Sequence, residues 1–505
     1  TAVASWRALY CNTTGGCNTA LGHGAMCFTT TAEGNTATGF VAMRNNTTGQ
    51  FNAAYGFCAL YANTTGPNNN AFGMCALRSN ETGDSNQAFG RAALGSNTSG
   101  CYNDAVGFAA LCSNTTGCFN TAIATSSVRG NTTGCFNIGI GYASLRCNST
   151  ANFNTAVGAC SLFANTTGYD NTAIGFAALV TNTTGIRNTA SGKYALKLNT
   201  TGQKNTAIGT YALMKNTTAS YNTGSGTYSL YNNTTGNDNT ASGYKALFCN
   251  TTASYNAAFG KNTLKVNTTG TKNTALGTFS LLSNSTGSCN TASGYRALQA
   301  NTTGAYNIAT GTQSLYANTT GNFNTATGTQ SLLSNTTGCL NTATGMWALY
   351  SNTTGCNNTA VGACSLYANT TGVGLVAVGF KSLLANTCGK YNTASGYKAM
   401  CKTTTGCQNA AHGSEALFNN TTGCFNTAVG GVALYSNTTA CNNTAVGYRS
   451  QVNTTTGHSN AAFGTCSLYS NTTGYRNNAF GFYALRYTTT GFINDGFGYG
   501  TLKAI

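Results

Sequence analysis

The sequence predicts an all-β protein, a parallel β-solenoid in which each turn is one copy of a 17-residue repeat. The repeat continues through residues 1–505 without an insertion or a deletion, and glycine with β-branched neighbours fills positions where a helix is disfavoured. Surface loops tolerate insertions, so a constant length indicates a backbone that coils with fixed geometry. We therefore expect one uninterrupted solenoid over residues 1–505, a mature chain or a fragment of a longer fibre.

The repeat is seen in residues 171–187, NTAIGFAALVTNTTGIR, and again in residues 188–204, NTASGKYALKLNTTGQK. We number its positions 1 to 17, so that Asn171 is at position 1 and Arg187 at position 17. The chain holds 29 full repeats and a last one of twelve residues, with the consensus N-T-A-x-G-x-x-A-L-x-x-N-T-T-G-x-x. Each repeat is expected to form one turn, which gives about 30 turns.

Two short strands and two corners are expected in each turn. The strands would cover positions 2–6, as in Thr172–Phe176, and positions 7–11, as in Ala177–Thr181. Asn-Thr-Thr-Gly at positions 12–15 forms a corner, because Asn and Gly tolerate a left-handed backbone. Side-chain alternation places Ala of position 3 and Gly of position 5 in the core, with Leu of position 9. All 24 Lys and Arg lie at positions 6, 7, 10, 11, 16 and 17, outside this predicted core.

Position 4 is apolar along much of the chain, as at Phe89, Ile123 and Ile174, and Ser or Thr in the middle, as at Ser242 and Thr327. Two interpretations are open. The stripe lies outside and associates laterally with other rods, most simply in a homotrimer, because a long exposed apolar stripe is unusual on a monomer. Alternatively, position 4 faces the core of a rounder turn.

Composition excludes two classes of partner. The chain carries 24 Lys and Arg against 8 Asp and Glu, a formal net charge of +16, and only 6% of its residues are charged. The bases are spread thinly, without the dense cluster typical of a nucleic-acid interface. There is also no run of about 18 apolar residues. We expect neither a nucleic-acid partner nor a membrane span.

Catalytic chemistry is not expected. His23, His412 and His458 are far apart in sequence, and His412 with Glu415 is the nearest approach to an acid–base pair. The eight carboxylates form no paired constellation, and no CxxC motif or Cys/His cluster indicates a metal site. The sequence predicts no enzyme, no cofactor and no metal.

The 22 cysteines recur at particular positions. Residues one turn apart would have Cα atoms about 4.8 Å from each other, which a disulfide can bridge. We expect inter-turn disulfides in an oxidising compartment, and the alternative is that Cys acts as a small apolar residue. The candidates are Cys58, Cys75, Cys101, Cys118, Cys135, Cys339, Cys356, Cys407, Cys424 and Cys441.

Asn-Thr-Thr at positions 12–14 has two interpretations. It is an N-glycosylation signal in a secreted protein, and it is also a corner whose stacked Asn side chains can hydrogen-bond as a ladder. Outward Asn residues only about 4.8 Å apart would crowd neighbouring glycans, which favours the ladder. The candidate positions are Asn12, Asn46, Asn63, Asn114, Asn131, Asn165, Asn182, Asn216, Asn233, Asn301, Asn352 and Asn437.

The pentapeptides Asn154–Gly158 (NTAVG) and Asn171–Gly175 (NTAIG) resemble the motif of YadA-like head repeats in trimeric autotransporter adhesins. Similar Asn-Thr-Gly arrays occur in phage tail fibres and in surface proteins of large viruses. The resemblance implies a parallel β-roll, three chains side by side, and attachment at a cell or virion surface. The 17-residue period, the Asn-Thr-Thr-Gly corner and the cysteines differ from those heads.

Together these patterns predict a structural or adhesive extracellular fibre that assembles as a trimer or end to end into a filament, at a cell or virion surface. A cell-surface or glycan ligand would be its partner. The alternative is a surface-binding protein with a flat Thr-rich face for ice or glycan. That face would include Thr325 with Thr327 and Thr342 with Thr344.

Overall fold

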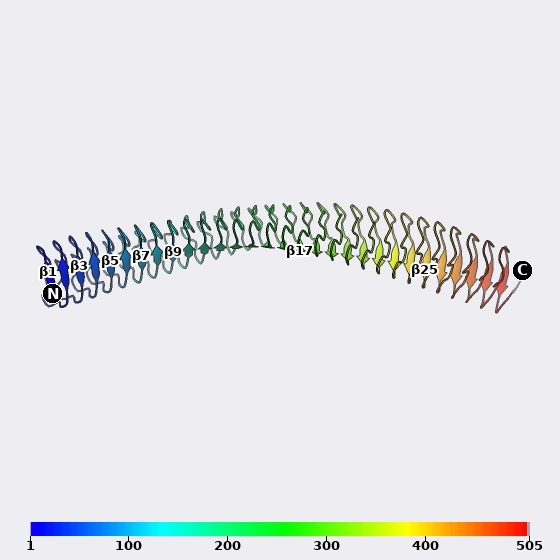
Figure 1. Ribbon diagram of the computed structural model, residues 1–505, viewed down its shortest axis with the longest axis horizontal. Helices are drawn as coiled ribbons and strands as arrows, with labels where there is room; N and C mark the ends of the chain where they lie inside the picture. The colour runs from blue at the N-terminus through cyan, green and yellow to red at the C-terminus, as the bar shows by residue number, and fades with distance from the viewer. Residues whose placement is uncertain (1, 502–505) are drawn as a thin grey trace. The chain divides into compact units, whose positions relative to one another are not determined.

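The computed structural model describes residues 2–501, and within them the chain is an all-β parallel β-solenoid with no helix. The predicted fold class and the 17-residue turn are confirmed. The chain divides into two compact units, Thr1–Ser254 (unit 1) and Tyr255–Ile505 (unit 2), which are described separately. In each unit successive strands lie side by side in chain order (Figure 1).

Each turn contributes one three-residue strand at positions 2–4. In unit 1 the strands are β1 (Ala2–Ala4), β2 (Thr19–Leu21), β3 (Thr36–Thr38), β4 (Ala53–Tyr55), β5 (Asn70–Phe72), β6 (Gln87–Phe89), β7 (Asp104–Val106), β8 (Thr121–Ile123), β9 (Ile138–Ile140), β10 (Thr155–Val157), β11 (Thr172–Ile174), β12 (Thr189–Ser191), β13 (Thr206–Ile208), β14 (Thr223–Ser225) and β15 (Thr240–Ser242). Neighbours pair in parallel with a register of one repeat, as in Ala173 opposite Ala190.

Unit 2 repeats this arrangement, with Ala326 opposite Ala343. Its strands are β16 (Ala257–Phe259), β17 (Thr274–Leu276), β18 (Thr291–Ser293), β19 (Ile308–Thr310), β20 (Thr325–Thr327), β21 (Thr342–Thr344), β22 (Thr359–Val361), β23 (Val376–Val378), β24 (Thr393–Ser395), β25 (Ala410–His412), β26 (Thr427–Val429), β27 (Thr444–Val446), β28 (Ala461–Phe463), β29 (Asn478–Phe480) and β30 (Asp495–Phe497).

The predicted second strand at positions 7–11 is wrong. These residues form a turn in which positions 7 and 9 have left-handed backbone, with φ of 51° at Ala177 and 50° at Leu179. The backbone groups nevertheless remain paired along the stack. Ala177 N–H donates to Ala159 O and Leu179 N–H to Ala195 O, both at 3.0 Å. Because these bonds run between turns, the segment needs no extended conformation to satisfy its polar groups.

Glycine at position 5 is required by its backbone and not by the core. Gly175 has φ of 123°, and a Cβ added there would lie 2.8 Å from the carbonyl of Gly192 in the next turn. The residue is half-buried, so its predicted place in the core is corrected to a close contact between turns. Only glycine combines this φ with such close stacking at no steric cost.

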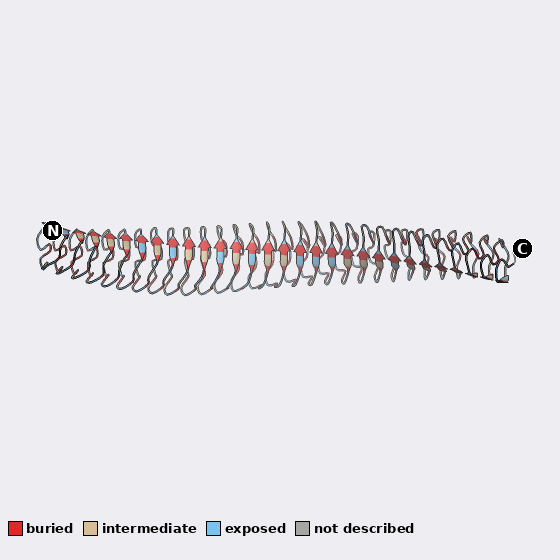
Figure 2. Cartoon of the chain, turned by 90° about the horizontal axis from the view of Figure 1, so that it is seen from below, coloured by how far each residue is buried: buried red, intermediate tan, exposed pale blue. Residues whose placement is uncertain are grey.

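The core is narrow and is made of Ala at position 3, Ala or Ser at position 8 and Leu at position 9. Ala173, Ala178 and Leu179 are all fully buried. The predictions for positions 3 and 9 are confirmed, whereas position 8 had been given no role. Figure 2 shows buried residues alternating with more exposed ones along the strands. Position 4 points outward, with Ile174 45% exposed, so the interpretation that it faces the core is wrong.

Candidate functional site

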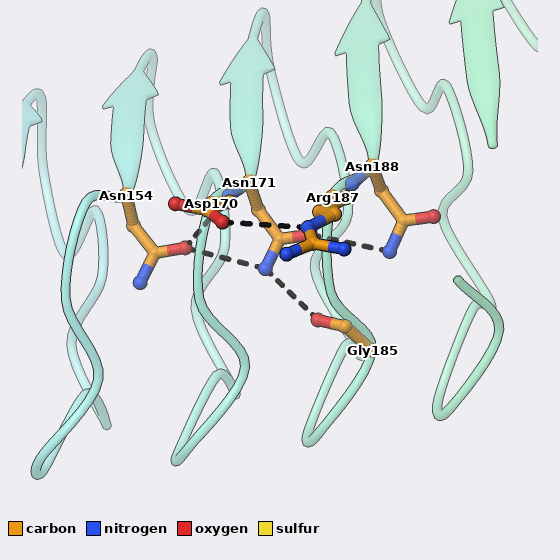
Figure 3. Close-up of polar contacts among 6 residues, drawn as sticks. All are labelled: Asn154, Asp170, Asn171, Gly185, Arg187 and Asn188. Atoms are coloured by element: carbon orange, nitrogen blue, oxygen red, sulfur yellow. Dashed lines mark hydrogen bonds and ion pairs between the residues drawn. The ribbon is translucent and has the colours of Figure 1, made fainter. Parts of the chain in front are cut away.

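Asparagine at position 1 forms a buried ladder, shown around Asn171 in Figure 3. Asn171 Nδ2 donates to Asn154 Oδ1 at 3.2 Å and to the Gly185 carbonyl at 2.9 Å. Its own Oδ1 accepts the backbone N–H and the Nδ2 of Asn188, at 3.0 and 3.1 Å. The side chain therefore satisfies both its donors and its acceptor inside the core, which removes the cost of burying an amide.

A second ladder runs along position 12. Asn182 Nδ2 donates to Asn165 Oδ1 at 2.9 Å and to Gly185 O at 3.0 Å, while Asn182 Oδ1 accepts from Asn199 Nδ2 at 2.8 Å. Gly185 O thus accepts one side-chain bond from each ladder. One carbonyl per turn ties the corner to the start of the strand.

The ladder at position 12 is interrupted where threonine replaces asparagine. Thr has no amide Nδ2, and its hydroxyl makes no hydrogen bond to the preceding asparagine, whose buried Oδ1 is left without a partner. This holds for Asn12, Asn386, Asn437 and Asn471, which precede Thr29, Thr403, Thr454 and Thr488.

These contacts bear on the Asn-Thr-Thr signal. Eleven of the twelve candidate asparagines are fully buried, namely Asn46, Asn63, Asn114, Asn131, Asn165, Asn182, Asn216, Asn233, Asn301, Asn352 and Asn437, and the twelfth, Asn12, is half-buried. A glycan on Nδ2 would remove one of the donors that Asn182 uses. It would also have no path to solvent, because Asn182 is fully buried. The geometry favours the ladder over glycosylation.

The predicted inter-turn disulfides are not formed. All 22 cysteines lie within residues 2–501 and are free thiols, including Cys58, Cys75, Cys101, Cys118, Cys135, Cys339, Cys356, Cys407, Cys424 and Cys441. At position 16 each sulfur instead accepts a backbone N–H from the preceding turn, as Cys118 Sγ does from Cys101 N–H at 3.1 Å. The thiol of Cys118 in turn donates to Thr116 O at 3.5 Å.

Position 16 is therefore a site for a small hydrogen-bond acceptor, and cysteine is one of several. Ser220 Oγ accepts the N–H of Gln203 at 3.0 Å, and Asn322 Oδ1 accepts that of Ala305 at 2.7 Å. Burial raises the pKa of Cys118 and of Cys424, and the N–H donated by the preceding cysteine acts in the opposite direction. At position 7, burial together with neighbouring Cys75 raises the pKa of Cys58.

The candidate acid–base pair is not assembled. His412 lies on strand β25 and is exposed, whereas Glu415 lies at position 7 on another side of the turn, and no hydrogen bond or ion pair joins these two described residues. His23 instead stacks on Phe40 and contacts the Trp6 ring at a tilt. Among residues 2–501, no three His, Cys, Asp or Glu side chains gather where they could hold a metal ion.

In the described part of the chain, no helix has the length and apolarity that a membrane crossing requires.

The outer surface of each turn divides into faces. Positions 2 and 4 form the strand face, on which Phe89, Ile123 and Ile174 are 40%, 40% and 45% exposed. No Lys or Arg occurs at these positions, and the carboxylates there are Asp104 and Asp495. Charge-poor apolar rows of this kind are typical of surfaces that contact another molecule.

Positions 6, 7, 10 and 11 form the groove face, which carries most of the positive charge. In unit 1 it holds ten bases and no acid. The bases are Arg7, Arg44, Arg78, Arg91, Arg129, Arg146, Lys193, Lys197, Lys215 and Lys245. The six acids of unit 1 are all at positions 13, 16, 17 or 2, and they are Glu33, Glu81, Asp84, Asp104, Asp170 and Asp238.

The groove face of unit 2 has eight described bases and one acid, Glu415. The bases are Lys261, Lys265, Arg296, Lys381, Lys398, Lys402, Arg449 and Arg486. Sequence reasoning missed this segregation of charge. The signal is in the positions of the acids, of which only Glu415 falls at a position of the groove face.

Shallow hollows follow the groove face in both units, between positions 7 and 10. One in unit 1 lies between Arg7 and Arg44, with Phe40 and Tyr61 in its lining. One in unit 2, of about 490 Å³, is lined by Trp347, Tyr367 and Lys381 among others. Bases and aromatic rings therefore line the same groove.

Comparison with known proteins assigns no family to the chain. No protein-family model matches the sequence, and no curated protein matches it either.

Proposed function

We propose that this chain is a structural and adhesive fibre protein of a cell or virion surface, in which the strand faces of several copies pack together. The observation that carries the proposal is the apolar strand face of unit 1, where Phe89, Ile123 and Ile174 are exposed in a sheet face without Lys or Arg. Burying such a row against a second copy would remove apolar area from water at roughly 25 cal/mol per Å².

The repetitive architecture supports the same proposal. Fifteen turns at a strand spacing of about 4.8 Å give each unit a length on the order of 70 Å. Every turn presents the same positions outward, so one lateral contact can repeat along a whole unit. A closed homotrimer is the simplest lateral assembly to propose, with an end-to-end filament as the other form. The proposal includes no catalytic activity and no cofactor.

The test is the mass and mass per length of the full chain, by analytical ultracentrifugation and electron microscopy. A variant with Ile123→Asp and Ile140→Asp places two charges on the strand face, and we expect it to dissociate the assembly. The matched control, Phe119→Asp with Phe153→Asp, changes two exposed aromatic residues at position 17 and should assemble normally. A wild-type chain that stays monomeric at all concentrations contradicts the proposal.

A second candidate function rests on the strand face of unit 2. There Thr325 pairs with Thr342 and Thr327 with Thr344, and the outward hydroxyl and methyl groups form a regular array. Such an array could order water or contact a neutral glycan. A thermal hysteresis assay on the full chain tests ice binding, with Thr327→Lys and Thr344→Lys as the variant. Absence of thermal hysteresis in the wild type would eliminate the ice-binding function.

A further inference from the structure

We propose that the groove face of unit 1 binds a linear acidic polysaccharide that carries carboxylate or sulfate groups and lies along the stack of turns. The inference rests on the proposed adhesive function, for which it names the ligand class and the place of contact. The site spans residues 188–254, four successive turns, of which three carry its lysines, Lys193, Lys197, Lys215 and Lys245.

Charge is the first argument. Unit 1 has ten bases and no acid on its groove face, and six acids with only two bases, Arg187 and Lys204, elsewhere. Arg187 lies 3.6 Å from Asp170, so part of that remaining positive charge is paired. A surface of one sign that continues along a groove concentrates a polymer of the opposite sign and raises its association rate.

The arrangement of the four lysines is the second argument. Lys193 and Lys245 lie at adjacent positions of the repeat but three turns apart, which is about 14 Å along the stack at the usual strand spacing. Lys197 and Lys215 lie at positions 10 and 11 of the repeat, in neighbouring turns. A linear polymer with regularly spaced acid groups can contact all four at once, whereas a small anion can contact only one or two.

Aromatic rings on the groove face support these lysines. Tyr211 and Tyr228 stack at position 7 with ring centroids 5.0 Å apart, and Tyr231 and Phe248 stack at position 10 at 5.2 Å. The two rows meet edge to face, as between Tyr228 and Tyr231 at 5.5 Å. The rings of the two rows thus pack against each other and form a continuous aromatic surface beneath the lysines.

The ammonium groups lie against these rings. Lys197 Nζ is 4.7 Å from the ring centre of Tyr194, Lys215 Nζ is 5.4 Å from that of Tyr231, and Lys245 Nζ is 5.7 Å from that of Phe248. A cation–π contact restrains a long side chain and leaves its N–H groups free to donate to an anion. Restrained lysines lose less entropy when they bind.

The stacked rings also favour a polysaccharide over a nucleic acid. Proteins that bind single strands offer exposed ring faces on which bases stack. On the groove face around the four lysines, ring faces are covered by neighbouring rings or by ammonium groups, so edges and phenol hydroxyls remain for contact. Edges and hydroxyls suit a hydroxylated, charged chain better than a planar base.

The experiment measures binding of the full-length chain to fluorescently labelled heparin and polygalacturonate oligosaccharides by anisotropy, at several salt concentrations. Neutral dextran and single-stranded DNA of equal charge are the comparison probes. We expect one or both acidic polysaccharides to bind more tightly than the DNA, and dextran not to bind. Binding should weaken as the salt concentration rises, because screening reduces the attraction.

The test variant replaces Lys193, Lys197, Lys215 and Lys245 by Gln. The control variant replaces four bases at position 17, Arg187, Lys204, Lys272 and Arg476, by Gln, which gives the same change in net charge. We expect affinity to fall roughly tenfold or more in the first variant and to change little in the second. Circular dichroism and hydrogen exchange check that both variants fold as the wild type does.

Several outcomes overturn the inference. Equal loss in both variants shows that only the net charge matters, and tighter binding of DNA than of either polysaccharide identifies another ligand class. Salt-sensitive self-association that disappears in the first variant shows that the groove holds a second copy. If the chain assembles but binds no acidic polysaccharide, only this inference is contradicted. If the chain is monomeric and binds one, only the fibre proposal is contradicted.

Discussion

The ladder at position 12 differs between two regions of the molecule. In unit 1 it continues without a break from Asn46 to Asn250, each Nδ2 donating to the asparagine one turn before. In unit 2, between residues 386 and 488, threonine interrupts it at Thr403, Thr454 and Thr488. The backbone is the same in both regions, so the fold tolerates the replacement at the cost of a buried carbonyl oxygen without a partner.

The two regions share the shape of the turn but differ in the hydrogen bonds that stabilise it. Thr403 is buried in the asparagine position and its Oγ1 still accepts weakly from Asn420 Nδ2 at 3.4 Å, so the shape of the turn is kept. Asn386 Oδ1, however, has no donor. Because each turn contacts mainly its neighbours, such a defect lowers stability locally and does not spread through the unit. We therefore expect the region from 386 to 488 to open more readily than that from 46 to 250.

The largest expected effect is that of Asn171→Ala in the unbroken region. The change removes two bonds donated by Asn171 and two accepted by it, and the buried backbone N–H of Asn188 loses its acceptor. We expect local opening to become easier by about 3 kcal/mol. Hydrogen exchange with mass spectrometry over residues 154–204 measures it. Thr184→Ala, at an exposed corner position, is the control, and equal exchange in both variants would contradict the ladder's role.

A smaller loss is expected for Asn182→Thr, which copies the natural interruption of unit 2 into unit 1. It leaves Asn165 Oδ1 without its donor, and removes the bond to Gly185 O, while the backbone keeps its shape. The expected destabilisation is about 2 kcal/mol, confined to the adjoining turns. The same exchange measurement applies, and a change that reached distant turns would show that the units are more cooperative than we infer.

The reverse change, Thr403→Asn, should repair the ladder in unit 2. Its Nδ2 can donate to the free Oδ1 of Asn386, and its Oδ1 can accept from Asn420. We expect a gain of about 1 kcal/mol in local stability, seen as slower exchange around residues 386–420. Thr404→Asn, at the neighbouring half-buried position, provides the control. Unchanged exchange in Thr403→Asn would mean that water already satisfies Asn386.

The smallest expected difference concerns the thiols, for which the two units should behave alike. Burial raises the pKa of Cys118 in unit 1 and of Cys424 in unit 2. At a given pH, a smaller fraction of each thiol is therefore ionised to the thiolate. Since the thiolate is the nucleophile, both should react with iodoacetamide more slowly than the exposed Cys17 and Cys388, and faster as the pH rises. Peptide mapping after timed alkylation measures the rates. Rapid alkylation of either central thiol would contradict this prediction.

Much of the fold could be predicted from the sequence because the same pattern recurs in every repeat, so that single substitutions do not obscure it. The 17-residue period, the buried Ala173 and Leu179 and the corner at Asn182 all follow from positions that hardly vary. The left-handed residues at positions 7 and 9 could not be predicted, because Ala and Leu seldom adopt that backbone. A weak signal existed at position 7, where Gly24 and Asn262 occur.

The candidate sites were harder to predict, since they depend on what each outward side chain meets one turn away. Cys101 and Cys118 have a spacing that suits a disulfide, but the sulfur of Cys118 accepts a hydrogen bond from the backbone N–H of Cys101 instead. The asparagine ladder was expected, whereas the shared Gly185 carbonyl that joins both ladders was not. The positive charge of the groove face could be predicted only by comparing the repeat positions of the bases with those of the acids.

The shared carbonyl has a consequence for how this chain can change in length. The ladder bonds of a turn reach only the same turn or the one before or after it, as those of Asn171 do to Asn154, Gly185 and Asn188. Removing or adding a whole repeat therefore joins two surfaces that already fit each other. Recombination between copies of the repeating DNA would lengthen or shorten the protein in steps of one turn without a folding penalty. The number of turns can thus evolve independently of the residues on each face.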